Sequence, residues 1–139
     1  MSAMTAGELE AFLYQAFPQL DPGSFEVRAV SAEGVQCRYT PGDRDLRPGG
    51  TVSGPTLMML SDTGMYLALL SRIGPVALAV TTSLAVSFLR KPVPGPLDIE
   101  VRLLKLGKRL AVGDVLVRSE DGRGPVSHAT VTYSIPPSV

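Results

Sequence analysis

The stretch SGPTLMMLSDTGMYLALL, residues 53–70, decides the fold of this chain. Leucines and methionines recur through it on almost every side of a helix, so that it has no polar stripe. A helix of this kind is buried on most of its surface. Asp62 nevertheless lies in its middle, although a carboxylate is costly to bury without hydrogen-bond donors or a water-filled cleft. The stretch therefore predicts a central buried helix whose carboxylate has a specific partner or task.

The start of this helix is a second feature of interest. The boundary signals predict a helix from about Pro55 to Arg72. Pro55 suits the first helical position, and Ser53 or Gly54 suits the N-cap. Amides at a helix start lack partners and carry partial positive charge. Because Gly54 has no side chain, a substrate oxygen that gains negative charge can approach its backbone closely.

Outside this helix the hydrophobic pattern predicts one more helix and six strands. Thr5 and Glu8 have the spacing of a capping box, which begins a helix over residues 5–17. FEVRAVS and VQCRY alternate like the strands of a hairpin, and four later strands are predicted over 77–91, 97–106, 109–119 and 125–135. A helix buried on most sides needs a sheet that curls around it. We expect a single α+β domain over residues 1–139.

Composition and charge exclude several functional classes. The chain is 45% apolar and 19% charged, which argues against disorder. Thirteen basic residues balance thirteen acidic ones, so there is no electrostatic footprint for nucleic acid. The N-terminus lacks the basic region of a signal peptide, and charges interrupt the apolar stretches, so no membrane span is predicted. The one cysteine, Cys37, forms no internal disulfide, and we expect a soluble cytoplasmic protein.

The spacing of Gly54 and Asp62 has a consequence for assembly. They lie eight residues apart, which is about 12 Å along a straight helix. Two groups this far apart cannot serve one carbonyl from the same helix. They can do so if each comes from a different chain, with the two helices antiparallel across an interface, so a site that uses both predicts a homodimer. The alternative is a structural Asp62 that caps a loop or accepts a hydrogen bond from Arg72 or Tyr66.

The segment SGPTLMMLSD, within this order of elements, resembles the hotdog-fold acyl-CoA thioesterases of the PaaI-like branch, in the 4-hydroxybenzoyl-CoA thioesterase superfamily. That family carries His-Gly-Gly and, seven residues after the second glycine, a catalytic Asp or Glu. This chain has Ser53-Gly54-Pro55 and then Asp62, so the first glycine and the acid match, whereas the histidine and the second glycine do not. VSFLRKPVPG, LLKLGKRLAVGDVLVRSEDG and HATVTYSIP extend the resemblance over about residues 47–136.

The resemblance implies a long helix wrapped by a curved antiparallel sheet, and hydrolysis of an aromatic or short- to medium-chain acyl-CoA. No cofactor is implied, because coenzyme A is part of the substrate. Asp62 would act as general base or nucleophile, and the Gly54 amide would bind the oxyanion. The family's sites lie at a dimer interface, which implies a homodimer or a homotetramer. The Ser53-Gly54-Pro55 departure leaves a non-catalytic acyl-CoA-binding or regulatory protein as the alternative.

Three further residues are candidates for contacts with the acyl group or the reacting centre. Ser53 stands in the place of the family's histidine. Tyr66, one turn after Asp62, can donate to the carboxylate, line the acyl pocket or simply pack in the core. Ser83 and Thr82 lie on opposite faces of a strand, so only one can face the site, and Ser83 is the candidate against ordinary strand filling.

Two basic residues, Arg90 and Lys91, follow the long strand. Exposed basic groups at the end of an element suit the phosphates of coenzyme A, although most such residues serve only solvation. Met58, Met59 and Met65 predict an apolar and adaptable acyl pocket.

His128 is the only histidine. It cannot build a His-rich metal site, and no cysteine cluster accompanies it, so no metal is predicted. The sequence places no motif Ser, Cys or acid near it, and we expect a structural role. This argues against hydration or dehydration chemistry.

Overall fold

The computed structural model describes residues 2–137. Its elements follow in the order α1 (Ala6–Ala16), β1 (Phe25–Val30), β2 (Gly34–Tyr39), the 3-10 turn η1 (Asp43–Asp45), β3 (Leu46–Arg47), β4 (Thr51–Val52), α2 (Gly54–Ile73), β5 (Val80–Phe88), β6 (Leu97–Leu106), β7 (Leu110–Arg118) and β8 (Pro125–Ser134). Both helices and all six strands expected from the pattern are present. Neither helix in this range has the length and apolar character that crossing a membrane requires.

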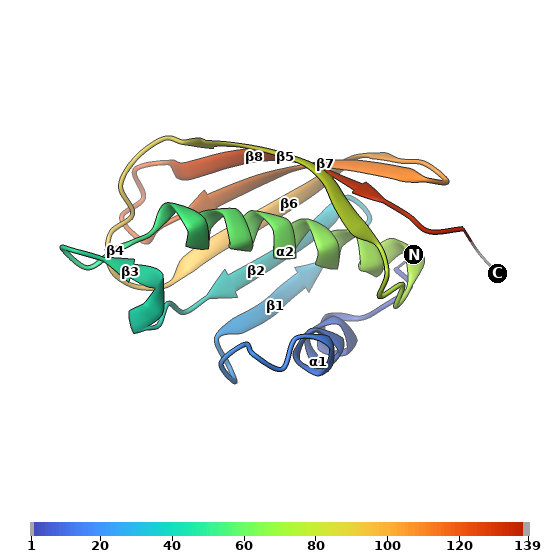
Figure 1. Cartoon of the computed structure of the whole chain (residues 1–139), viewed down its shortest axis with the longest axis horizontal. Helices are drawn as coiled ribbons and strands as arrows, with labels where there is room; N and C mark the ends of the chain where they lie inside the picture. The colour runs from blue at the N-terminus through green and yellow to red at the C-terminus, as the bar shows by residue number, and fades with distance from the viewer. Residues whose placement is uncertain (1, 138–139) are drawn as a thin grey trace.

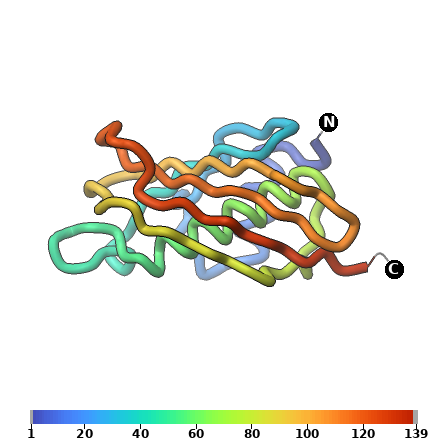
Figure 2. Tube along the Cα trace, turned by 90° about the horizontal axis from the view of Figure 1, so that it is seen from above, coloured from blue at the N-terminus to red at the C-terminus, as the bar shows by residue number. Residues whose placement is uncertain are grey.

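The six longer strands form one antiparallel sheet in the order β1-β2-β6-β7-β8-β5. Helix α2 runs along one face of this sheet, and α1 lies beside β1 at the other edge from β5 (Figure 1). Seen from above, the curved strands β5 to β8 pass over the long helix (Figure 2). This arrangement confirms the predicted hotdog fold.

Local signals explain how the two helices begin. Thr5 is the N-cap of α1, and both hydrogen bonds of the predicted capping box with Glu8 form. Ser53 is the N-cap of α2 and accepts a hydrogen bond from the Thr56 amide. Gly54 is therefore the first helical residue, so α2 begins one residue earlier than the sequence predicted. Pro55 takes the second helical position instead of the first.

Two glycines let α2 lie close to the sheet. A Cβ at Gly64 would lie 3.0 Å from a methyl group of Val101, and a Cβ at Gly113 would lie 2.6 Å from the sulfur of Met65. Met65 is thus fully buried between the helix and β7. The prediction that Met65 lines an acyl pocket is wrong, because it faces the sheet instead.

Strand β5 differs from the predicted strand in a way that affects the site. It covers Val80–Phe88 rather than residues 77–91, and its register with β8 shifts between Thr81 and Ser83. Thr81 pairs with Tyr133, whereas Ser83 pairs with Thr132. Since neighbouring residues of β8 point to opposite faces of the sheet, this bulge puts Thr81 on the face of α2 and Ser83 on the outer face.

Candidate functional site

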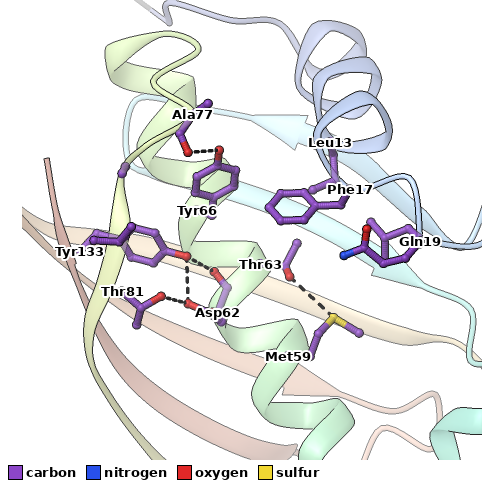
Figure 3. Close-up of a pocket in the computed structure, with 13 residues that line it drawn as sticks. Leu13, Phe17, Gln19, Met59, Asp62, Thr63, Tyr66, Ala77, Thr81 and Tyr133 are labelled. Carbon is purple, nitrogen blue, oxygen red and sulfur yellow. Dashed lines mark hydrogen bonds between the residues drawn. The ribbon is translucent and has the colours of Figure 1, made fainter. Parts of the chain in front are cut away.

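Asp62 is half-buried on the side of α2 that faces β5 and β8 (Figure 3). Its Oδ1 accepts one hydrogen bond from the Thr81 hydroxyl, at 2.6 Å, and a second from the Tyr133 hydroxyl, at 2.9 Å. Among residues 2–137, no group donates a hydrogen bond to Oδ2. The carboxylate is therefore held by one oxygen and leaves the other free to react.

Tyr133 is suited to hold that carboxylate. Its ring is buried, and its hydroxyl also lies 3.2 Å from the main-chain oxygen of Asp62. Burial raises the pKa of Tyr133 well above its ordinary value, and the negative charge of Asp62 raises it further, while the Thr81 hydroxyl opposes the shift. The phenol consequently remains protonated, and a donor, at any physiological pH.

A cavity of about 460 Å³ opens beside Asp62, between α1, α2 and the start of β5 (Figure 3). Most of its wall is apolar or aromatic, and the Asp62 carboxylate is its charged group. It is lined by Leu13, Phe17, Gln19, Leu20, Met59, Asp62, Thr63, Tyr66, Ala77, Ala79, Val80, Thr81 and Tyr133. Of the three methionines predicted to form an acyl pocket, Met59 alone lines this cavity.

Tyr66 forms part of this wall and does not donate to Asp62. Its hydroxyl donates instead to the main-chain oxygen of Ala77, at 3.2 Å. Its ring packs edge-on against Phe17, with 5.9 Å between the ring centroids. Arg72, the other donor considered for Asp62, contacts the main-chain oxygen of Ala32. The partners of Asp62 therefore come from the sheet rather than from its own helix.

At the start of α2, every amide except that of Gly54 is occupied or missing. The Ser53 amide donates to the main-chain oxygen of Asp45, at 2.8 Å, and the Thr56 amide donates to the Ser53 hydroxyl, at 3.3 Å. Pro55 has no amide hydrogen. Within residues 2–137, the Gly54 amide has no acceptor. It is thus the free donor at the positive end of a 20-residue helix.

Gly54 lies in a second cavity, of about 580 Å³, which also contains Arg47, Arg90 and Lys91. Arg90 and Lys91 are exposed, and Arg90 donates to the main-chain oxygen of Pro125, at 3.3 Å. The structure thus divides the predicted site residues into two groups. Asp62 and Tyr66 line one cavity, whereas Gly54, Arg90 and Lys91 line the other, with Ser53 at the helix start beside them.

The hydroxyl that contacts Asp62 belongs to Thr81, not to Ser83 or Thr82. Ser83 is exposed on the outer face and lines neither cavity, and Thr82 donates to the main-chain oxygen of Thr132, at 3.4 Å. Strict alternation from Leu84 backwards would turn Thr82 inwards, and the bulge reverses that order. The sequence gives no plain signal for this bulge, so Thr81 could not be selected from the pattern.

His128 has an acidic neighbour that the sequence did not indicate. Its Nε2 lies 3.1 Å from Oδ1 of Asp114 on the adjacent strand β7. The prediction that no acid lies near His128 is therefore wrong. The pair is on the outer face of the sheet, however, since the adjacent Ala129 is buried towards α2. No group of three or more potential metal ligands occurs in the described part of the chain.

Comparisons with known proteins bear on these two cavities. A family model described as "Thioesterase superfamily" matches residues 49–126, which is more than half of the chain. The "putative thioesterase" of Silicibacter sp. TM1040 has 44% sequence identity and a TM-score of 0.90, over 99% of this chain and 95% of its own. No curated protein sequence matches significantly.

Two more distant structures share the fold. Zebra fish thioesterase superfamily member 2 has a TM-score of 0.82 at 17% identity, over 96% of this chain and all of its own (100%). A "hypothetical thioesterase protein" of Streptococcus pneumoniae TIGR4, solved with coenzyme A, has a TM-score of 0.76 at 21% identity, over 94% of this chain and 98% of its own.

Proposed function

The chain belongs to the thioesterase superfamily, and we propose that it hydrolyses the thioester bond of an acyl-CoA at a site built from Asp62 and Gly54. One observation carries the proposal: Oδ1 of Asp62 is held by two hydroxyl donors, while Oδ2 is free beside an apolar cavity. A carboxylate held in this way presents one oxygen in a fixed direction, as a base or nucleophile requires.

Two routes are consistent with this geometry. In the first, Oδ2 takes a proton from water while the water oxygen bonds to the thioester carbon. The carbonyl oxygen becomes negative and accepts a hydrogen bond from the Gly54 amide, then the C–S bond breaks and the proton passes to the sulfur. In the second, Oδ2 itself bonds to the carbon and the thiolate leaves. Water then attacks the Asp62 carbonyl carbon of the mixed anhydride, so that the former Oδ2 departs with the acyl group and a water oxygen stays on Asp62. Turnover in heavy-oxygen water, followed by mass analysis of the Asp62 peptide, separates the two routes.

The site is completed by a second copy of the chain. Within one chain, Asp62 and Gly54 line different cavities and lie about 12 Å apart along α2. Strand β5 is an unpaired edge of the sheet and carries exposed apolar side chains, among them Val80 and Phe88. A two-fold axis through β5 would run the two α2 helices antiparallel and bring Asp62 of each copy towards Gly54 of the other. The dimer can associate further into a tetramer.

The surroundings of the two cavities support an acyl-CoA substrate. The apolar and aromatic wall beside Asp62 suits an aromatic or short- to medium-chain acyl group. Arg90 and Lys91 in the cavity of Gly54 suit the phosphates of coenzyme A. A structure of the same fold contains coenzyme A, which supports this class of ligand.

Mixed dimers test the shared site. Asp62→Asn removes the free carboxylate oxygen, and Gly54→Pro removes the amide hydrogen at a helical position that accepts proline. Each homodimer should release thiol from acyl-CoA esters far more slowly than the wild type. Coexpression of the two variants should restore activity, because roughly a quarter of the sites then combine an unchanged Asp62 with an unchanged Gly54. Inactive mixed dimers would contradict the shared site.

Assays of the wild-type protein distinguish a thioesterase from a non-catalytic acyl-CoA-binding protein. Thiol release from several acyl-CoA esters is expected. Saturable binding of these esters without any turnover would instead identify an acyl-CoA-binding protein, and Ser53-Gly54-Pro55 would then be the relevant departure from the family's motif.

A further inference from the structure

A second carboxylate, Asp45, is more deeply buried than Asp62 and has no part in the steps above. Its residue is 5% exposed, and among residues 2–137 no basic side chain forms an ion pair with it. A charge buried without a cation is costly unless hydrogen bonds replace the lost water. Its position in the fold therefore needs an explanation.

Every oxygen of Asp45 accepts a hydrogen bond. Oδ2 accepts from the Tyr39 hydroxyl, at 2.7 Å, and from the Gly42 amide, at 2.8 Å. Oδ1 accepts from the Thr56 hydroxyl, at 3.1 Å. The main-chain oxygen accepts from the Ser53 amide, at 2.8 Å. Asp45 thus ties strand β2, the loop before β3 and the first turn of α2 to one residue.

A chain of two hydrogen bonds links the start of α2 to Asp45. The Ser53 hydroxyl donates to the Thr56 hydroxyl, at 3.0 Å, and the Thr56 hydroxyl donates in turn to Asp45. Ser53 and Thr56 lie on either side of Gly54 in the chain. The positive end of α2 also favours a negative charge at this place. The direction of the Gly54 amide is therefore set by residues that Asp45 holds.

The site favours a carboxylate over an amide. Three donors point at the side chain of Asp45. A carboxylate offers acceptors alone, whereas an asparagine would turn its NH₂ group towards at least one of these donors. An asparagine would therefore force the Thr56 or Tyr39 hydroxyl to turn and accept instead of donate, which disturbs the arrangement that the carboxylate holds.

We propose that Asp45 is a positioning residue, which fixes the start of α2 and thereby aims the Gly54 amide at the oxyanion; this rests on the function proposed above. A donor at an oxyanion contributes through its position, so a small displacement lowers the rate of the chemical step rather than the affinity for substrate.

Three variants test this, with one control. Asp45→Asn disturbs the acceptor, and Thr56→Val removes one donor while it keeps the branched shape. Thr56→Ser keeps the hydroxyl and should restore the wild-type behaviour in large part. Asp98→Asn is the control, because Asp98 pairs with Arg38 on the outer face, at 2.9 Å, away from α2.

Hydrogen exchange and kinetics are measured on the wild type and on each variant. Asp45→Asn and Thr56→Val should accelerate exchange over residues 54–60 by about tenfold, the equivalent of one lost hydrogen bond to a charged group. They should lower kcat by a factor on the order of 10 to 100 and change KM far less. A lower melting temperature with unchanged kcat and KM would overturn the proposal, because it would show a structural role alone.

The exchange measurement separates this inference from the proposed function. If the wild type hydrolyses no ester, the proposed function fails, but faster exchange over residues 54–60 still shows that Asp45 fixes the start of α2. If the wild type is active and exchange in Asp45→Asn equals that of Asp98→Asn, the positioning role is refuted while the thioesterase proposal stands.

Discussion

The hydroxyl of Tyr133 lies 2.9 Å from Oδ1 of Asp62 and 3.2 Å from the main-chain oxygen of the same residue. A side chain from the last strand thus contacts both the carboxylate and the backbone of a residue 71 positions earlier. The contact fixes the rotation of the Asp62 side chain and the place of that helical turn relative to the sheet. Oδ2 is left without a donor among residues 2–137 as a direct result.

Tyr133→Phe should therefore lower kcat without abolishing it. The Asp62 carboxylate keeps the Thr81 hydroxyl but loses its second donor, so we expect a fall in kcat of about tenfold, with a smaller change in KM. Initial rates of thiol release give both constants.

Tyr14→Phe is the matched control for that substitution. The Tyr14 hydroxyl also bonds a backbone, that of Phe25, at 2.9 Å and 2.7 Å, but it lies away from Asp62. It should cost stability and leave kcat unchanged. Equal losses of kcat in the two variants would show that the loss of any tyrosine hydroxyl bonded to the backbone has this effect.

Asp62→Asn should lower kcat by a factor on the order of 100 or more, because the amide can neither take a proton nor attack a carbonyl. The substitution keeps the size of the side chain, and its oxygen can still accept from Thr81 and Tyr133. We expect an unchanged elution volume in size-exclusion chromatography. A fully active variant would exclude Asp62 from the chemistry.

Gly54→Ala should lower kcat/KM by about tenfold and leave the melting temperature close to that of the wild type. A Cβ at this position would lie 3.5 Å from the Phe88 ring, which is an ordinary contact, so the fold can accept it. The added methyl group fills space beside the free amide that the carbonyl oxygen must approach. Unchanged kcat/KM would show that the carbonyl oxygen does not need the space that Gly54 leaves beside its amide.

Stability should fall steeply at alkaline pH. Burial raises the pKa of the Cys37 thiol from its ordinary value of 9.0 to about 12, with a smaller contribution from Glu10. Between these pH values the unfolded chain loses this proton while the folded chain keeps it, so the free energy of unfolding decreases as the pH rises. The slope for one proton is about 1.4 kcal/mol per pH unit.

Urea unfolding at several pH values between 8 and 11 measures that slope. Cys37→Ala should make the decline shallower from pH 9 upwards, whatever its effect at neutral pH. Burial also raises the pKa of Tyr133, so part of the alkaline decline should remain in the variant. An identical slope in Cys37→Ala and wild type would contradict the assignment to Cys37.

Much of the fold was predictable because its signals are local. The capping box at Thr5, the apolar helix after Ser53 and the period of two in the later strands each depend on residues close in sequence. The contacts of Asp62 were not predictable, because they depend on how distant strands align. The bulge after Thr81 changes which hydroxyl faces the helix, and the spacing gives no indication that Tyr133 meets Asp62.

The same limit applies to Asp45. In the sequence it is one of several charged residues in a polar, glycine-rich loop, which suggests an exposed position. Asp45 can be buried because Tyr39 of β2 and Thr56 of α2 donate hydrogen bonds to it. No sequence motif links either of these residues to Asp45. Distances along α2, by contrast, follow from helical geometry alone, so the separation of Gly54 and Asp62 could be stated in advance.

The hairpin of β3 and β4, residues 46–52, leaves the body of the protein at Asp45 and returns to it at Ser53. Both anchor residues lie outside the hairpin and bond each other through the Ser53 amide. Val52 is buried in the core, whereas residues 46–50 are mostly exposed. The entropic cost of closing a loop grows slowly with its length, so residues 46–50 can be exchanged while the start of α2 keeps its place. The residues that react, Asp62 and Gly54, are therefore separate from the hairpin residues, which can vary and so change which substrates reach the site.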